Sequence, residues 1–217
     1  MNAMQNTQYP LPSILYLTPS SRAPGRRKSI GQFRLNSLDL DRFNRLLGRL
    51  GRPQAPLVAD QVVTAARELN QGSDQAEPPC IAQRIRRAET VAEMVADTTW
   101  MSTSASDTAL PARLVAEYLQ GPESLIPDWL PQIGRLDDAI VLEAAWPHLA
   151  GEVDGYLDFR RLRRIEADLR GCTEEDFRFD RKDWLQERQV EAALNAQRSA
   201  VREASYLPAP CAMFHIH

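Results

Sequence analysis

The sequence predicts an all-α protein, an irregular multi-helix bundle with an extended N-terminal arm. Apolar residues recur every three or four positions over most of the chain, which is the spacing of one face of an α-helix. Strand-like alternation is confined to Phe177 and Phe179, on either side of Arg178. With 217 residues, 43% of them hydrophobic, the chain is long enough to bury a substantial core.

Residues 1–32 are rich in Pro, Ser, Asn and Gln and contain a basic cluster, 22–28, so we expect an extended or disordered arm. The arm is either a solvated tail or a docking segment that attaches to a partner or to the domain's own surface. The docking interpretation involves its apolar residues Ile14, Leu15, Tyr16 and Leu17. No positive residue precedes this apolar patch and prolines break it, so we do not expect a signal peptide.

A helical domain is expected over residues 33–205. Ser37 can cap a first helix that ends at Gly51, and a second apolar repeat runs from Val58 to Leu69. These two helices are expected to form an antiparallel pair joined by a short loop. A third helix is expected near residues 80–99, and a fourth from residue 107 or 108 to Gly121.

Two further helices are predicted towards the C-terminus. Apolar residues at 156, 159, 162, 165 and 169 define an amphipathic helix that ends at Gly171. The last helix is predicted from Asp180 to about Ala204. Its apolar stripe is thin, so it should lie on the surface or reach across to a partner; the stripe consists of Trp184, Leu185, Ala193, Leu194 and Val201. Residues 206–217 are expected to form a flexible tail.

The segment 121–146 combines prolines, a glycine and aspartates in an unusual pattern. Pro127 suits the first turn of a helix, whereas Pro131 cannot continue one, so residues 126–133 are predicted to form a short helical turn. Gly134 then permits a sharp reversal of the chain.

A longer helix is predicted to begin at Leu136. Its first turn contains Asp137 and Asp138, where negative charge meets unpaired N–H groups and the positive end of the helix dipole. Pro147 marks the expected end of this helix, or a kink in it.

The stretches SLIPDWLP, at 124–131, and IGRLDDAIVL, at 133–142, resemble the YkvA-like family, a small helical domain of bacterial and archaeal proteins with no assigned function. The hallmark of that family is an Ile-Pro-Asp turn and a hydrophobic pair with Pro, followed by Gly, one residue, Leu and a double Asp. The matching positions are Ile126, Pro127, Asp128, Pro131, Gly134, Leu136, Asp137 and Asp138. The match covers roughly residues 114–149, and the resemblance places the family's core at about 107–170.

Many members of this family are regarded as membrane-associated, so the resemblance implies contact with the membrane surface. This chain departs from those members because polar residues are interspersed with the apolar stretch: Gln120, Glu123, Gln132, Arg135 and Glu143. It also has Pro122-Glu123-Ser124 where relatives often have a Pro-Ile/Leu-Asp step.

Asp128, Asp137 and Asp138, with Glu123 nearby, are spaced closely enough to converge on a cation, and carboxylate oxygens are the ligands of hard metals. In the alternative interpretation, Asp137 and Asp138 serve the start of their helix, while Asp128 accepts hydrogen bonds from backbone N–H groups around the turn. Neighbouring helix positions point about 100° apart, so Asp137 and Asp138 are poorly placed to ligate one ion together.

Three further groups of side chains have more than one interpretation. His148 is either a ligand of haem or a transition metal, or a capping or surface residue. The C-terminal tail either binds a metal ion or is a mobile chain end without a ligand. Its candidate metal ligands are Cys211, His215 and His217. The basic face is either a solvated helix face with intrahelical ion pairs or a contact for anionic lipid or nucleic acid; it consists of Arg160, Arg161, Arg163 and Arg164.

Composition limits the classes of function. The 26 Lys and Arg residues against 29 Asp and Glu give a net charge of −3, which argues against a general nucleic-acid binder. Three distant cysteines without C-x-x-C spacing favour a reduced compartment, so we expect a cytoplasmic protein. No stretch approaches the ~18 to 20 apolar residues of a transmembrane helix. We find no phosphate-binding loop and no catalytic motif, and expect no cofactor.

The leading hypothesis is a non-enzymatic helical protein that binds a partner protein or the membrane surface. The first alternative is metal binding, or a metal-dependent activity, centred on the three aspartates. The second is haem or transition-metal binding through His148 or the tail.

Overall fold

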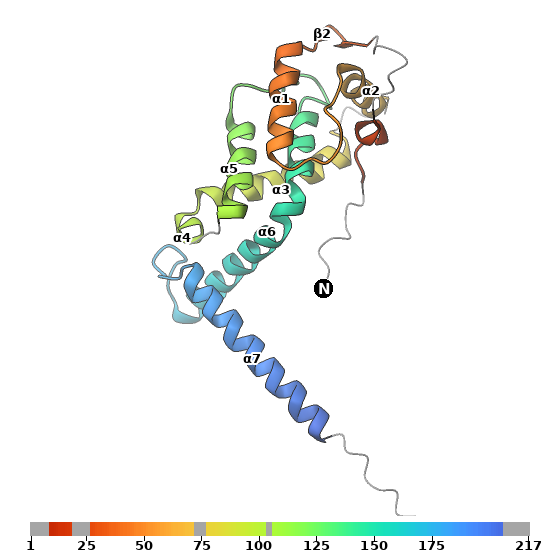
Figure 1. Cartoon of the computed structure of the whole chain (residues 1–217). Helices are drawn as coiled ribbons and strands as arrows, with labels where there is room; N and C mark the ends of the chain where they lie inside the picture. Colours follow the sequence, from red (N-terminus) through yellow and green to blue (C-terminus); the bar gives the residue numbers. More distant parts are fainter. Residues whose placement is uncertain (1–8, 19–26, 72–76, 103–105, 206–217) are drawn as a thin grey trace, which may run out of the picture. The chain divides into compact units, whose positions relative to one another are not determined.

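The computed structural model describes residues 9–18, 27–71, 77–102 and 106–205. These residues form seven α-helices, a short 3-10 helix and one two-stranded sheet (Figure 1), so the predicted all-α multi-helix fold is confirmed. Cys211, His215 and His217, with the rest of the predicted tail, lie outside the described residues.

The described elements contain no internal structural repeat. The 3-10 helix η2 (Ser13–Tyr16) comes first, followed by the strands β1 (Ser29–Ile30) and β2 (Phe33–Arg34). The helices are α1 (Ser37–Arg49), α2 (Ala59–Leu69), α3 (Pro79–Ala96), α4 (Thr98–Met101), α5 (Ser106–Gln120), α6 (Leu136–Arg170) and α7 (Arg181–Ser205). The chain divides into two compact units, and the boundary falls inside α6, between Arg160 and Arg161. This boundary lies within the predicted helical domain 33–205.

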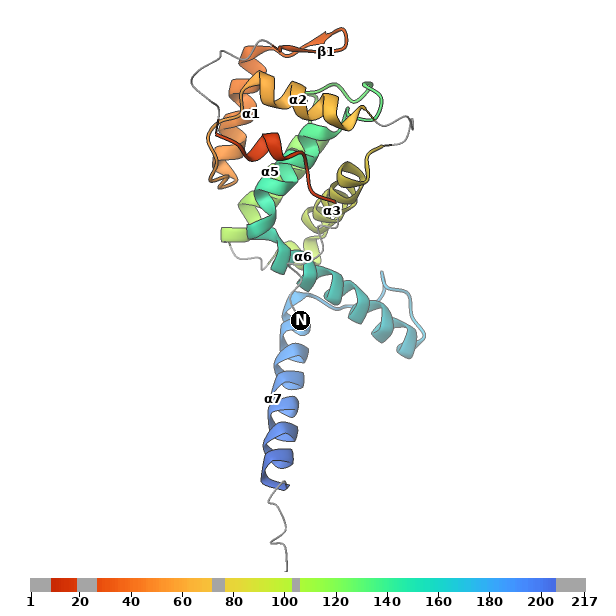
Figure 2. The same cartoon turned by 90° about the vertical axis from the view of Figure 1, so that its right-hand side faces the viewer.

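The core of unit 1 surrounds the first half of α6. Figures 1 and 2 show α1, α2, α3 and α5 grouped around this half. Its first two turns, residues 136–142, are buried on every side of the helix. Leu136, Ala139, Val141, Leu142, Ala145 and Leu149 are each at most 1% exposed. A helix buried all round belongs to the centre of a fold, so this half of α6 organises unit 1.

Aromatic side chains close the core further along α6. The ring of Trp100, from α4, lies 5.7 Å from that of Tyr156 and 5.2 Å from that of Phe159. The indole N–H of Trp100 donates to Glu152 at 3.0 Å, so the one polar atom of this buried ring is satisfied.

Local chemistry explains several helix boundaries. The side chain of Asn36, rather than that of Ser37, caps α1 by accepting from the N–H of Leu38 at 3.1 Å. The third helix, expected near 80–99, ends at Ala96 because Asp97 caps the separate helix α4, accepting from the N–H of Thr99 at 2.9 Å.

Of the two alternatives that we expected at Pro147, an end of the helix or a kink, the structure excludes the end. Helix α6 continues through Pro147 to Arg170, so the two helices predicted on either side of it are one. A proline removes one helical hydrogen bond. Ala145, Leu149 and Val153 are each at most 3% exposed. Their burial against the rest of unit 1 offsets that loss.

The predicted N-terminal arm is partly folded. Leu11 and Leu15 are 3% and 2% exposed, so a solvated tail is wrong for this stretch, and Leu15 docks on the domain's own surface. Tyr16 and Leu17 stay 40% and 57% exposed. Residues 29–34 form a small antiparallel hairpin in which Gly31 has a φ of +56°.

Candidate functional site: a buried carboxylate and an exposed helix face

Asp137 is fully buried at the start of α6. Its Oδ2 accepts hydrogen bonds from the backbone N–H groups of Leu125 and Ile126, at 2.8 and 3.1 Å. The same oxygen accepts from the hydroxyls of Ser124 and Tyr118, at 3.0 and 2.6 Å. One carboxylate oxygen thus joins the last turn of α5, the following loop and α6.

We call Asp137 and the four groups that donate to it the Asp137 centre. Burial is the main influence on the pKa values in this centre. It raises the pKa of Asp137, while the hydrogen bonds from Tyr118, Ile126 and Ser124 oppose that shift. Burial and the neighbouring Asp137 raise the pKa of Tyr118. Oδ1 of Asp137 is buried and has no hydrogen-bond partner.

The loop after Pro127 is a series of hydrogen-bonded turns, where the sequence predicted a short helical turn. The N–H of Leu130 donates to the carbonyl of Pro127, and that of Gly134 donates to the carbonyl of Leu130, both at 3.0 Å. Gln132 has a positive φ of 66°. Ile126 and Leu136, the apolar residues of the motif, are both fully buried, while Pro131 is exposed.

Gly134 lies where the turn has no room for a side chain. A Cβ built on it would be 2.5 Å from the carbonyl oxygen of Asp128, closer than such contacts occur in proteins. The reversal expected at Gly134 therefore depends on the close approach of two backbone segments.

Asp138 faces a different environment from its neighbour. Its Oδ2 lies 3.6 Å from Nε of Arg135, whose Nη1 is in turn 3.7 Å from Glu89 of α3. Burial and the charge of Asp137 raise the pKa of Asp138 to about 7, although Arg135 acts in the opposite direction.

The three aspartates of the motif occupy separate surroundings. The Oδ2 of Asp137 faces four donors, Asp138 faces a guanidinium, and Asp128 is exposed. The described residues contain no group of three His, Cys, Asp or Glu side chains that could hold a metal ion. We considered Asp128 as the side chain that accepts hydrogen bonds from backbone N–H groups of the turn. In the structure, Asp137 accepts them.

A groove of about 570 Å³ borders this centre, between α1, α5 and the loop that follows α5. Tyr118 and Ser124 line it and also donate to Asp137. On its rim, Arg42 lies 3.5 Å from Glu123. The apolar lining consists of Phe43, Leu46, Leu114 and Leu125.

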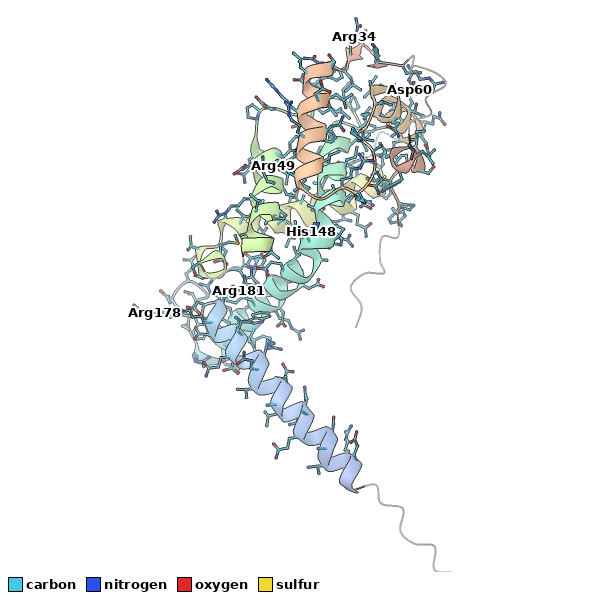
Figure 3. The ribbon with its side chains drawn as sticks, in the orientation of Figure 1. Arg34, Arg49, Asp60, His148, Arg178 and Arg181 are labelled. Carbon is cyan, nitrogen blue, oxygen red and sulfur yellow. The ribbon has the colours of Figure 1, made fainter. Side chains whose placement is uncertain are left out.

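His148 lies on the exposed surface of α6 (Figure 3). Its Nε2 would be 2.7 Å from a Cβ on Gly51, which has a φ of +80°. His148 thus takes the space that a side chain at position 51 would need.

The four arginines of the predicted basic face lie in different settings. Arg160 forms an ion pair with Glu93 of α3, and its guanidinium lies 5.8 Å from the ring centre of Tyr156. Arg163 donates twice to the backbone carbonyl of Glu174, at 3.1 and 2.7 Å. Arg161 and Arg164 are exposed. Arg160 and Arg163 therefore stabilise their own units by contacts outside the helix.

Sequence reasoning missed the polar side chains that hold the N-terminal segment. Arg84 of α3 is 1% exposed; it donates to the carbonyl of Tyr9 at 3.0 Å and pairs with Glu143 of α6 at 2.7 Å. Gln61 of α2 donates to the carbonyls of Ile14 and Leu17, at 3.0 and 2.7 Å. These residues stand in ordinary helical patterns, so no local feature distinguished them.

Helix α7 presents an exposed apolar face. From Gln189 to Glu203 every side chain is exposed. Val190, Leu194 and Val201 fall within about 40° of one another around the helix, and their side chains are 50%, 48% and 58% exposed. The predicted stripe contained Leu194 and Val201 but missed Val190. Along the described part of the chain, no helix combines the length and apolar character needed to cross a membrane.

No family model matches the chain, and the searches found no curated protein and no solved structure similar to it. The resemblance to the YkvA-like family therefore rests on its motif and stays a prediction.

Proposed function

We propose that this protein is a non-enzymatic binding protein that docks on a partner protein through one face of α7. The observation that carries this proposal is the exposure of Val190, Leu194 and Val201 on one side of a 25-residue helix. Most of the stability of a helix in a protein comes from packing its apolar face. In both views no other described element of unit 2 lies beside the second half of α7 (Figures 1 and 2). A partner that covers this face would supply that packing.

The charge of α7 favours a protein over an anionic membrane as the partner. Its five basic residues, Arg181, Lys182, Arg188, Arg198 and Arg202, are nearly balanced by four acidic ones, Asp183, Glu187, Glu191 and Glu203. Helices that lie on membranes are typically enriched in Lys and Arg on their polar face. The membrane surface is the second candidate, suggested by the family resemblance.

The cellular setting is part of the same proposal. The cysteine spacing supports a cytoplasmic location, and the Ile126 to Asp138 motif supports membership of the YkvA-like family. The described cysteines, Cys80 and Cys172, are free thiols.

The test compares two aspartate substitutions on opposite sides of α7. Leu194→Asp places a charge in the centre of the apolar face, whereas Ala192→Asp places it about 160° away, on a side that is also exposed. Tagged full-length chains are incubated with extract of the cells that produce the protein, and separately with vesicles containing phosphatidylserine. We expect wild type and Ala192→Asp to retain a stoichiometric protein partner, and Leu194→Asp to lose it.

A partner retained equally by all three chains would contradict docking through this face. Vesicle binding that depends on Leu194, without a protein partner, would assign the face to the membrane surface. Circular dichroism of each variant verifies that the helices are intact.

A further inference from the structure

The charged residues that flank the apolar face of α7 indicate which kind of partner protein would bind to this face. Glu187, Glu191, Arg198 and Arg202 lie along one edge of this face, about 40 to 100° from its centre. The acidic pair comes first in the helix and the basic pair second. Over the span of these charges, residues 186–202, the opposite edge is uncharged and includes Gln186, Ala193 and Ala200.

These charges are symmetric about a point near the middle of the helix. Glu191 and Arg198 lie equally far from the point between Leu194 and Asn195, and so do Glu187 and Arg202. When two identical helices pair in opposite directions about that point, their charged edges face each other. Each glutamate then lies level with an arginine of the other copy.

The apolar residues obey the same symmetry. Leu194 lies beside the centre, so the two copies of Leu194 would meet there. Val190 of one copy would lie within about 3 Å, along the helix axis, of the level of Val201 in the other. Val190 and Leu194 also have the spacing of consecutive core positions of a heptad repeat, and Val201 follows Leu194 by one heptad.

Resting on the proposed function, we infer that the partner of α7 is a second copy of this chain, joined by antiparallel pairing of two α7 helices. If the two α7 helices paired in the same direction, the charged edge of each copy would face the uncharged edge of the other. None of these ion pairs would then form. Glu191 already accepts from Arg188 at 2.5 Å, but exposed pairs of this kind contribute little, so the glutamate remains available to the second copy.

The pairing is expected to be weak. Helix α7 has 25 residues, and the charged Asp183 and Glu187 and the polar Gln197 interrupt its apolar core positions. Such a small interface falls at the lower end of specific protein contacts, so we expect the dimers to be reversible and their formation to depend on chain concentration.

Sedimentation equilibrium of the full-length chain, from about 1 to 500 μM and at low ionic strength, tests the inference. We expect reversible dimers for wild type and for Ala192→Asp, and monomers for Leu194→Asp. The double substitution Glu187→Arg/Glu191→Arg places like charges opposite each other and should weaken dimerisation at least tenfold. Adding Arg198→Glu/Arg202→Glu reverses all four charges, so the quadruple variant should dimerise like wild type.

Wild type that stays monomeric over this range would overturn the inference, and so would a quadruple variant as weak as the double variant. If the wild-type chain is monomeric but still retains a different protein through Leu194, this inference fails while the proposed function stands. If Leu194→Asp alters neither self-association nor partner retention, both fail. Circular dichroism verifies that each variant keeps its helices.

Discussion

At the scale of single residues, Gly134 shows the tightest constraint. Its absent side chain lets the turn pass the carbonyl of Asp128, which belongs to the backbone and cannot rotate away. We therefore expect Gly134→Ala to lower the free energy of unfolding by about 2 to 3 kcal/mol, measured by urea denaturation.

Gly48→Ala is the matched control for that substitution. Gly48 lies inside α1, and a Cβ there would meet nothing within 4 Å. The same change should stabilise the protein by about 0.5 to 1 kcal/mol, because alanine favours a helix more than glycine does. Equal stability of both variants would contradict the close approach at Gly134.

The raised pKa of Asp138 predicts that the stability of the protein depends on pH. Its pKa is about 7 in the folded protein, against a usual value of 3.8, so between these values the folded state holds a proton that the unfolded state has lost. The stability contributed by the neutral carboxyl is complete below pH 4 and is lost as the pH rises through 7.

Asp138→Asn is neutral at every pH and should avoid this loss. We expect the free energy of unfolding of the variant, relative to wild type, to increase by on the order of 2 kcal/mol between pH 5 and pH 8. Urea denaturation at both pH values measures it. A difference that stays constant, or falls, would show that the Asp138 carboxyl is ionised throughout.

At the scale of elements, the N-terminal segment and α6 are connected through buried polar side chains. Leu15 anchors the segment, and Gln61 and Arg84 donate to its backbone carbonyls. Tyr16 donates to Glu143 of α6 at 3.2 Å, and burial raises the pKa of Tyr16 to about 12.

Leu15→Asp should release the segment, because a charge cannot stay in this apolar site. Hydrogen exchange should accelerate for the amides of residues 11 to 17 and remain slow for residues 139 to 149 of α6. Ser13→Asp is the control, since Ser13 is exposed on η2. Unchanged exchange in the Leu15 variant would mean that the polar contacts alone hold the segment.

At the scale of the whole molecule, the buried core and the exposed apolar face of α7 belong to different units. Unit 1 contains the buried half of α6, the Asp137 centre and the aromatic cluster of Trp100. Unit 2 contains α7, whose side chains are exposed from Gln189 to Glu203. Self-association through α7 belongs to this scale, because it would join two molecules without altering the core of unit 1.

The sequence alone determined the fold class and the approximate positions of the helices. These follow from periodicity and from Gly and Pro at helix ends, which act between residues close in the chain. It also singled out Asp137 and Gly134 as unusual, and noted that the stripe of the last helix is thin.

Only the tertiary structure decided what these residues do. Asp137 accepts from Tyr118, Leu125 and Ile126, donors 11 to 19 positions away, and local patterns carry no information on which distant groups will meet. The same holds for Arg84 and Glu143, and for Pro147, whose local cost is outweighed by the burial of Ala145, Leu149 and Val153 on one face of α6. Hydrophobic periodicity predicts that a helix has an apolar face, whereas packing decides whether that face is covered, as in α6, or exposed, as in α7.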